Sequence, residues 1–178
     1  MPFRNFLGGW GWGGYVTRVT PPPPDPPLQL DQERKSLTLE FLHSVYPKWT
    51  HVYTDGSATD ATRDGGGGVL IGYREEDAAH SVATGRYSTN YKAEAEALEK
   101  AARELHSNLP RAHEKIVIFT DAISVLQALE KNDKELNELA LALSTLSSKP
   151  DVTLQWVPAH CGVRGNETAD RLAKEGGL

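Results

Sequence analysis

The segment IVIFTD at residues 116–121 constrains the fold more than any other part of the chain. Its first four residues are apolar on both faces, which is typical of a strand buried in a sheet that is covered on both sides. Helix-forming segments precede and follow it, and crossovers of that length join parallel strands. The segment therefore predicts an α/β fold.

The patterns around this strand predict the rest of the sheet. Three strands come first and form an antiparallel meander, at residues 51–57, 68–73 and 79–86, with a turn at the glycine run 64–68. Helices follow at residues 89–108, 122–130, 134–146 and 166–176, and a fifth strand at 152–157. The order βββαβααβα predicts a mixed five-stranded sheet with helices on both faces.

Local signals indicate where the helices begin and end. Thr89 or Asn90 suits the cap of helix 89–108, and Asn166 and Gly176 suit the start and end of the last helix. The glycine run lacks the Lys-Ser/Thr of a phosphate-binding loop and lies between strands. We therefore interpret it as a hairpin turn.

Residues 1–47 differ in composition from the rest. GGWGWGG and PPPPDPP predict a Gly/Pro-rich tail over 1–27, either a flexible linker or a docking peptide for a proline- or aromatic-binding partner. Residues 31–46 predict a short helix that ends near Pro47. We therefore divide the chain into a tail with a helical lead-in (1–47) and an α/β domain (48–178).

Composition bounds the setting of the protein. The single cysteine, Cys161, excludes an internal disulfide and favours an intracellular location, in the cytoplasm or nucleus. No apolar run approaches the roughly 20 residues of a membrane span, and the N-terminus has no continuous apolar core of a secretory signal. We expect a monomer without a membrane partner. The net charge of −5, carried by residues 48–178, is unusual for a nucleic-acid-binding domain.

Four acidic residues stand out by their position. Asp55 lies near the end of the first strand and Asp121 directly after the buried strand, so their carboxylates should meet at one edge of the sheet. Asp170 lies early in the last helix. Glu94 shares a face with Ala97, Leu98 and Ala101, whereas Glu96 and Glu99 lie on the charged face of the same helix. Helical geometry therefore selects Glu94 as the fourth member.

Four carboxylates on a core-facing edge repel one another unless cations neutralise them. Mg²⁺ binds carboxylate oxygens and keeps positions for water and phosphate oxygens. Two such ions can activate a water and stabilise the leaving oxygen in phosphodiester hydrolysis. We therefore expect Asp55, Glu94, Asp121 and Asp170 to bind two Mg²⁺ ions, with Asp55 as a bridging ligand.

The motifs TDGS (54–57), TNYKAEAEAL (89–98), TD (120–121) and AHCGVRGNETAD (159–170) together resemble type-1 ribonuclease H domains. The motif sequences are most similar to those in the domains of non-LTR (LINE-like) retrotransposon polyproteins, in which a proline-rich stretch and a YP-containing segment also precede the TDGS strand. The resemblance implies cleavage of the RNA strand of RNA–DNA hybrids by an endonuclease. It also implies that the acidic residues of the family's active site correspond to the four residues chosen above.

The same resemblance implies further site residues. The family's loop histidine falls on His160, which is expected to shuttle a proton or help product leave, and its hybrid-contacting groups fall on Gly56, Ser57 and Asn90. Asn166 and Glu167 also match the family's last motif, but capping of the final helix explains them equally well. Trp156 is expected to belong to the core.

The chain also departs from the family. It has no lysine-rich protruding helix and no separate hybrid-binding domain, and Ala122 replaces a common serine. Weak, salt-sensitive substrate binding and help from a linked reverse transcriptase domain are therefore expected. Two other functions stay open: a transposase, integrase or exonuclease of the same fold, and a non-catalytic domain that binds nucleic acid or scaffolds a polyprotein.

Overall fold

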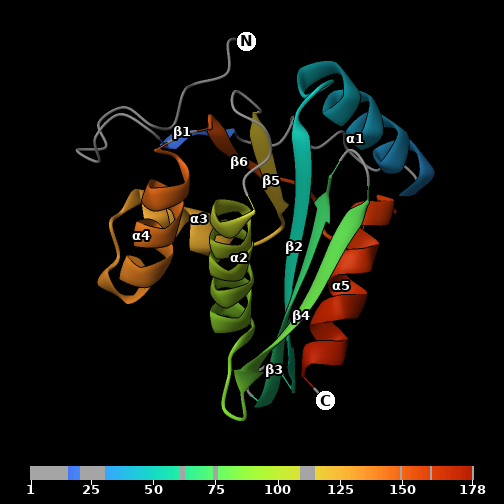
Figure 1. Ribbon diagram of the computed structural model, residues 1–178. Coiled ribbons are helices and arrows are strands. Elements are labelled where there is room, and N and C mark those ends of the chain that lie inside the picture. Colours follow the sequence, from blue (N-terminus) through green and yellow to red (C-terminus); the bar gives the residue numbers. More distant parts are fainter. Residues whose placement is uncertain are drawn as a thin grey trace.

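The protein is described here by a computed structural model, which covers residues 16–20, 31–60, 63–73, 76–108, 115–148, 150–160 and 162–177. Figure 1 shows one twisted sheet with helices on both sides. In chain order the elements are β1 (Val16–Thr20), α1 (Asp31–Val45), β2 (Thr50–Thr59), β3 (Arg63–Gly72), β4 (Asp77–Gly85), α2 (Asn90–Ser107), β5 (Ile116–Thr120), α3 (Ile123–Glu130), the 3₁₀ turn η1 (Lys134–Leu136), α4 (Asn137–Leu146), β6 (Val152–Trp156) and α5 (Arg164–Gly176).

The sheet has the mixed topology that the sequence predicts. Strands β2, β3 and β4 form the antiparallel meander, whereas β5 and β6 lie parallel to β2. The predicted helix at 31–46 is confirmed as α1, and the oxygen of Thr89 caps α2 by accepting a hydrogen bond from the main-chain N–H of Lys92 at 3.1 Å. The α/β fold class and the order of the five predicted strands are therefore confirmed.

A sixth strand lies where the sequence predicts only a tail. Strand β1 pairs in parallel with β6 at one edge, so the spatial order is β1-β6-β5-β2-β3-β4. Five residues between a glycine-rich and a proline-rich run carry too little periodicity to predict a strand, and pairing with β6 supplies the missing hydrogen bonds. The two flanking runs, GGWGWGG and PPPPDPP, lie outside the described residues.

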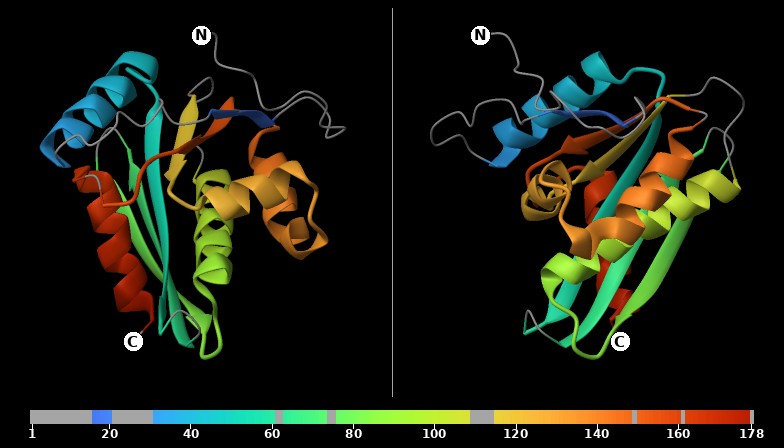
Figure 2. Two further views of the ribbon diagram at one scale, coloured as in Figure 1. Left: turned by 180° about the vertical axis from the view of Figure 1, so that it is seen from behind. Right: turned by 90° about the vertical axis from the view of Figure 1, so that its left-hand side faces the viewer.

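Two hydrophobic clusters lie on opposite sides of the sheet. Helices α2, α3 and α4 cover the larger cluster, while α1 covers a smaller one that includes Leu42, Tyr46 and Phe119. In Figure 1, helices α2, α3 and α4 lie to the left of β2, and α1 and α5 lie to its right; the views in Figure 2 agree. Among the described helices, none combines the length and apolar character needed to cross a bilayer.

The glycine run is not a turn, contrary to the sequence prediction. Gly65 to Gly68 lie inside β3, and the missing side chains of the last three admit the helices on alternate faces of the sheet. A Cβ at Gly66 or Gly68 would overlap the main chain of α5, and one at Gly67 would lie 3.1 Å from the Cβ of Ala97 in α2. Close packing of two helices on one strand therefore explains glycines that look like a turn in the sequence.

The last helix begins earlier than predicted. Helix α5 starts at Arg164 after Val163, so Asn166 is not its cap but a buried residue in its first turn. Gly165 allows this early start, because a side chain there would overlap the ring of Tyr53. Packing against β2 therefore sets the start of α5, and a local capping signal does not.

Candidate active site

Two carboxylates are brought side by side by the parallel pairing of β2 and β5. Tyr53 pairs with Phe119, and Asp55 and Asp121 each follow two residues later. The sequence suggested that Asp55 lies near the end of its strand. Strand β2 continues to Thr59, however, so Asp55 lies in its middle. The pairing with β5 nevertheless stops before Asp55, which leaves its carboxylate at the edge where β5 gives way to α3.

Missing side chains bring the two helices to this edge. A Cβ at Gly56 would overlap the main chain of α2 at Glu94, and a Cβ at Gly68 would overlap the main chain of α5 at Ala169, the neighbour of Asp170. Gly68 is the cross-strand partner of Asp55, so both face α5. The two glycines therefore form a cradle that places α2 and α5 against the strand carrying Asp55.

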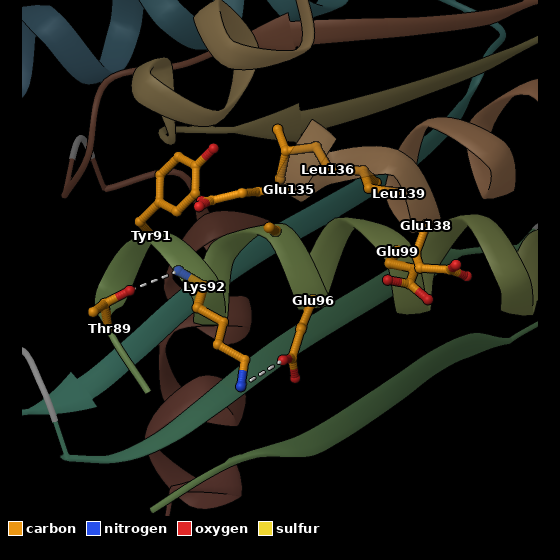
Figure 3. A pocket seen from close by; sticks show the side chains of 10 residues that line it. Thr89, Tyr91, Lys92, Glu96, Glu99, Glu135, Leu136, Glu138 and Leu139 are labelled. Carbon is orange, nitrogen blue, oxygen red and sulfur yellow. Dashed lines mark hydrogen bonds and ion pairs between the residues drawn. The ribbon is translucent and has the colours of Figure 1, made fainter. Parts of the chain in front are cut away.

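The two candidate glutamates of α2 lie on different sides of the helix. The carboxylate of Glu94 interacts electrostatically with those of Asp121 and Asp55. Glu96 instead pairs with Lys92 at 3.5 Å and lines an outer pocket of about 420 Å³ between α2, η1 and α4 (Figure 3). The geometric choice of Glu94 over Glu96 agrees with this arrangement.

The cluster is electrostatically strained. Burial, followed by repulsion from Asp121, raises the pKa of Asp55 to about 7, although its carboxylate accepts a hydrogen bond from the N–H of Gly56 at 2.7 Å. Burial and repulsion from Asp121 likewise raise the pKa of Glu94 to about 7. Burial also raises the pKa of Asp121. Burial is the largest cause of each shift, and repulsion among the neighbouring acids adds to it.

Two basic groups partly offset this charge. The amino group of Lys174 lies 2.7 Å from Oδ2 of Asp170, one turn away on α5. That hydrogen bond raises the pKa of Lys174, and the more distant Asp55 adds to the effect. His160 lies close enough to oppose the rise in the pKa of Asp121. Asp170 is therefore the best-compensated member of the cluster.

The cluster fits a hard divalent cation in its donor chemistry. Oδ1 of Asp121 is buried and has no hydrogen-bond partner within the described residues, so an acceptor is available where a cation would bind. The four carboxylates are neighbours and not a closed shell, since no three Asp, Glu, His or Cys side chains of the described residues converge closely enough to hold an ion as they stand. Binding would therefore draw the side chains inward.

The loop before α5 presents His160 to the cluster. His160 is exposed and has a φ of 52°, a left-handed conformation in which histidine is found more often than most residues. Gly162, with a φ of 73°, follows two residues later, and the side chain of Lys35 in α1 lies against it. Gly162 therefore lies beside α1, and His160 lies on the same loop.

The residues that resemblance assigned to substrate also lie together. Oδ1 of Asn90 accepts a hydrogen bond from the N–H of Ala58 at 2.8 Å, which ties the start of α2 to the strand segment that contains Gly56 and Ser57. Ser57 and Asn90 are both at least partly exposed. The predicted substrate groups thus come from two neighbouring segments, β2 and the start of α2, beside Asp55.

Sequence reasoning missed two contributions to this edge. The glycines of β3 were assigned to a turn, and Trp156 only to the core, whereas its indole also donates a hydrogen bond to the carbonyl of Asp121 at 3.2 Å. A glycine run inside an otherwise strand-like pattern is the signal that could have revealed the close helices. No local signal reveals the tryptophan contact.

Comparisons with known proteins identify the family of the chain. Residues 47–177 match the family described as RNase H. The chain is also similar to the crystal structure of RNase H1 from the halophilic archaeon Halobacterium salinarum NRC-1, at 25% sequence identity and a TM-score of 0.56, over 71% of this chain and 96% of that one. The chain therefore belongs to the RNase H family and is a ribonuclease H, a hydrolase of the nuclease class.

Proposed function

We propose that the protein hydrolyses the RNA strand of RNA–DNA hybrids with two divalent metal ions, Mg²⁺ or Mn²⁺, bound at the acidic edge. One observation carries the proposal: carboxylates from four separate elements share one edge, and two of them have a pKa raised to about 7. A fold tolerates such repulsion at a site where cations bind. Membership of the RNase H family supports the hybrid as substrate.

The proposed roles of the residues follow from their surroundings. Asp55, Glu94, Asp121 and Asp170 would hold the ions, which supply a nucleophilic water and stabilise the leaving oxygen when bound. Within the described residues, Asp121 offers a buried Oδ1 without a hydrogen-bond partner, and Asp55 lies on the segment of β2 that α2 approaches at Gly56. These four carboxylates therefore act as the metal ligands in this proposal.

His160 and the surface beside Asp55 complete the proposal. His160 is exposed on the loop and near Asp121, so it can move a proton to the leaving 3′-oxygen or promote product release. Gly56, Ser57 and Asn90 would contact 2′-hydroxyl groups, which distinguish the RNA strand from DNA. Substrate selection and proton transfer thus fall on different parts of the same edge.

The test compares three substrates under one set of conditions. The chain is incubated with labelled RNA–DNA hybrid, duplex RNA and duplex DNA, with Mg²⁺ or with chelator, beside Asp121→Asn. Metal-dependent cutting of the hybrid RNA alone supports the proposal. Cutting of DNA indicates a transposase, integrase or exonuclease, and binding without cutting that Asp121→Asn leaves unchanged indicates a non-catalytic domain.

We further propose that the chain is part of a retroelement polyprotein or derives from one, and that a linked reverse transcriptase domain helps it hold the hybrid. The support is the phrasing of the motifs, the proline-rich and YP-containing segments before TDGS, and a net charge of −5 that disfavours strong phosphate binding. Sequencing of the transcript upstream tests this origin. An open reading frame for a reverse transcriptase in the same frame supports it, and an unrelated upstream region contradicts it.

A further inference from the structure

A chain of three hydrogen bonds, joined through the covalent structure of Gln155 and Trp156, connects Tyr46, the residue after α1, to the main chain at Asp121. The hydroxyl of Tyr46 donates to Oε1 of Gln155 at 2.8 Å, and Nε2 of Gln155 donates to the carbonyl of Trp156 at 2.8 Å. The indole Nε1 of Trp156 then donates to the carbonyl of Asp121 at 3.2 Å. The chain therefore ends at a residue whose carboxylate belongs to the acidic edge.

The first link of this chain is shielded from water. Tyr46 is 3% exposed and Gln155 is 0% exposed, and aromatic rings surround the tyrosine, with Trp49 at 5.0 Å and Phe119 at 5.9 Å between centroids. A buried donor or acceptor that loses its partner has no water to replace it. The Tyr46–Gln155 hydrogen bond is therefore expected to be persistent and geometrically defined.

The connection passes from one face of the sheet to the other. Gln155 and Trp156 are successive residues of β6, so their side chains point to opposite faces. Gln155 reaches Tyr46 on the side of α1, whereas Trp156 packs against the larger cluster on the side of α2 and α3. Strand β6 thus couples the packing of α1 to the opposite face, from which the indole reaches Asp121.

Asp121 lies in the short connection between the end of β5 and Ala122, the cap residue of α3. The carbonyl of Asp121 also accepts from the N–H of Ile123 at 2.9 Å, a bond within the same short connection. The indole of Trp156 is thus a contact from a different strand that anchors this connection.

We infer that Tyr46, Gln155 and Trp156 are positioning residues of the metal site, which orient the carboxylate of Asp121 through its main chain. The inference rests on the metal site of the proposed function. Tyr46 precedes the region matched to the RNase H family, residues 47–177, so the segment before that region takes part in organising the site. Residues that orient a ligand affect metal affinity without contacting the ion.

The test measures metal binding separately from catalysis in the full chain. Trp156→Phe removes the indole donor, and Tyr46→Phe removes the hydroxyl but keeps the ring. The readouts are the Mg²⁺ concentration that gives half of the thermal stabilisation, and kcat and KM on the hybrid. We expect that concentration to rise about tenfold for Trp156→Phe and about threefold for Tyr46→Phe, with kcat lowered and KM within about twofold of wild type.

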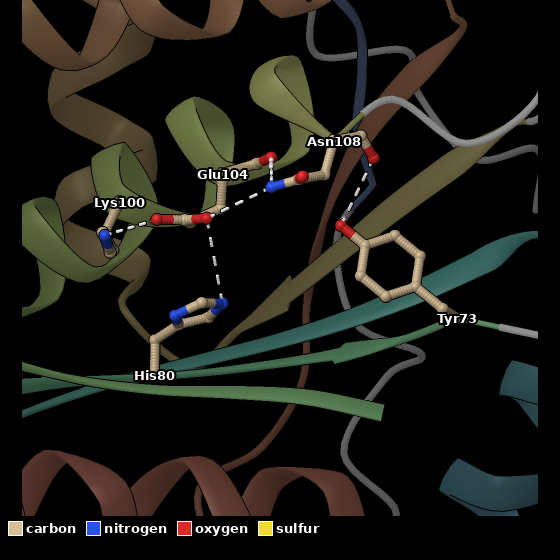
Figure 4. Close-up of polar contacts among 5 residues, drawn as sticks. All are labelled: Tyr73, His80, Lys100, Glu104 and Asn108. Carbon is tan, nitrogen blue, oxygen red and sulfur yellow. Dashed lines mark hydrogen bonds and ion pairs between the residues drawn. The ribbon is translucent and has the colours of Figure 1, made fainter. Parts of the chain in front are cut away.

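Tyr73→Phe is the matched control. It removes a tyrosine hydroxyl that donates to the carbonyl of Asn108 at 3.5 Å, at the end of α2 that lies about 20 Å along the helix from Glu94 (Figure 4). Its metal dependence should equal that of wild type. If Tyr46→Phe has the same metal dependence as Tyr73→Phe, the inference is overturned. This comparison decides the question even where Trp156→Phe fails to fold.

The outcome separates this inference from the proposed function. A wild-type protein that Mg²⁺ and Mn²⁺ leave unshifted in thermal unfolding and inactive on the hybrid overturns the metal site and the inference with it. A wild type that binds metal and cuts the hybrid, beside variants that do so equally well, overturns the inference alone.

Discussion

Glutamates on the two sides of helix α2 lie in opposite electrostatic surroundings. On the outer side, Glu96 pairs with Lys92 at 3.5 Å and Glu99 with Arg103 at 2.8 Å. On the inner side, burial and Asp121 raise the pKa of Glu94 to about 7. The outer side neutralises its own charge, whereas the inner side leaves an anionic site that an external cation can occupy.

The difference follows from helical spacing and not from residue chemistry. Glu94 and Glu96 are two residues apart, which is about 200° around a helix, so one must face the sheet when the other faces solvent. A pair formed four residues apart on the exposed side has little desolvation to overcome. A carboxylate on the buried side loses much of its hydration. The basic groups near the cluster, Lys174 and His160, act on Asp170 and Asp121 and not on Glu94.

The largest expected effect is on the inner side. Asp121→Asn should lower the rate of hybrid hydrolysis at least about 1,000-fold, because a metal ligand that stabilises charge in the transition state supplies several kcal/mol. Rates are measured under single-turnover conditions with Mg²⁺ in excess. Glu96→Gln on the outer side is the control and should stay within about twofold of wild type; equal losses in both variants would contradict the assignment.

The glycine cradle is the next most sensitive feature. Gly68→Ala should lower the free energy of unfolding by about 3 kcal/mol, because its Cβ would overlap the main-chain carbonyl of Ala169, which cannot move without shifting α5. Urea denaturation measures the change. Gly72→Ala in the same strand is the control, since its Cβ would lie 3.3 Å from the nearest atom, and it should cost less than about 1 kcal/mol.

The loop histidine should matter less than the acids. His160→Ala is expected to slow hydrolysis about 100-fold, since proton transfer by one positioned side chain contributes roughly this much. The metal concentration for half-maximal thermal stabilisation should stay unchanged, because His160 is not a ligand in the proposal. A large shift in that concentration, with the rate at saturating metal intact, would make it a ligand instead.

The inner side should also make the metal-free protein sensitive to pH. The folded-state pKa of Asp55 and of Glu94 is raised to about 7, so the folded protein binds more protons than the unfolded chain. Its free energy of unfolding therefore falls as the pH rises from about 4 to about 7, and we expect a loss of several kcal/mol, roughly 2 for each of the two groups, between pH 5 and pH 8 in chelator. Urea denaturation at both pH values measures it.

Two additions distinguish this effect from general charge repulsion. Asp55→Asn should flatten the pH dependence, because it removes one of the two titrating groups and relieves the other. Saturating Mg²⁺ should restore stability at pH 8 in the wild type more than in Asp55→Asn. A metal-free stability that rises between pH 5 and pH 8 is incompatible with the raised pKa values.

The outer side should show the smallest effect. Glu99→Gln breaks an exposed pair with Arg103, 2.8 Å long and four residues apart, and should lower the free energy of unfolding by about 0.3 kcal/mol. Hydrolysis should be unchanged. A loss of activity in Glu99→Gln would mean that the outer side of α2 contacts substrate, which would remove the contrast between the two sides.

Much of the fold could be predicted because its signals are local. Apolar runs such as residues 116–119 and the helical spacing in 89–108 reveal the elements, and the crossovers make β5 and β6 parallel to β2. The positions of Asp55 and Asp121 relative to those strands were sufficient to bring them together. The division at residue 47 stays a prediction, although α1 and Tyr46 pack against the sheet.

The errors share one physical cause, which is contact between distant segments. The glycines of β3 looked like a turn because the helices that fill their space lie up to about a hundred residues away. Asn166 was predicted to be a cap because no pattern in the neighbouring residues indicates that Gly165 packs on Tyr53. That packing lets α5 start earlier, at Arg164. Strand β1 forms only through pairing with β6.

The sequence by itself determined the order of the elements and the helical spacing that puts Glu94 and Glu96 on different sides of α2, because hydrophobic periodicity and helical spacing are properties of neighbouring residues. Only the tertiary structure decided how closely α2 and α5 approach β2 and β3, and that the indole of Trp156 supports Asp121. Steric exclusion and hydrogen bonding act between whichever atoms become neighbours in space, and folding alone determines which atoms those are.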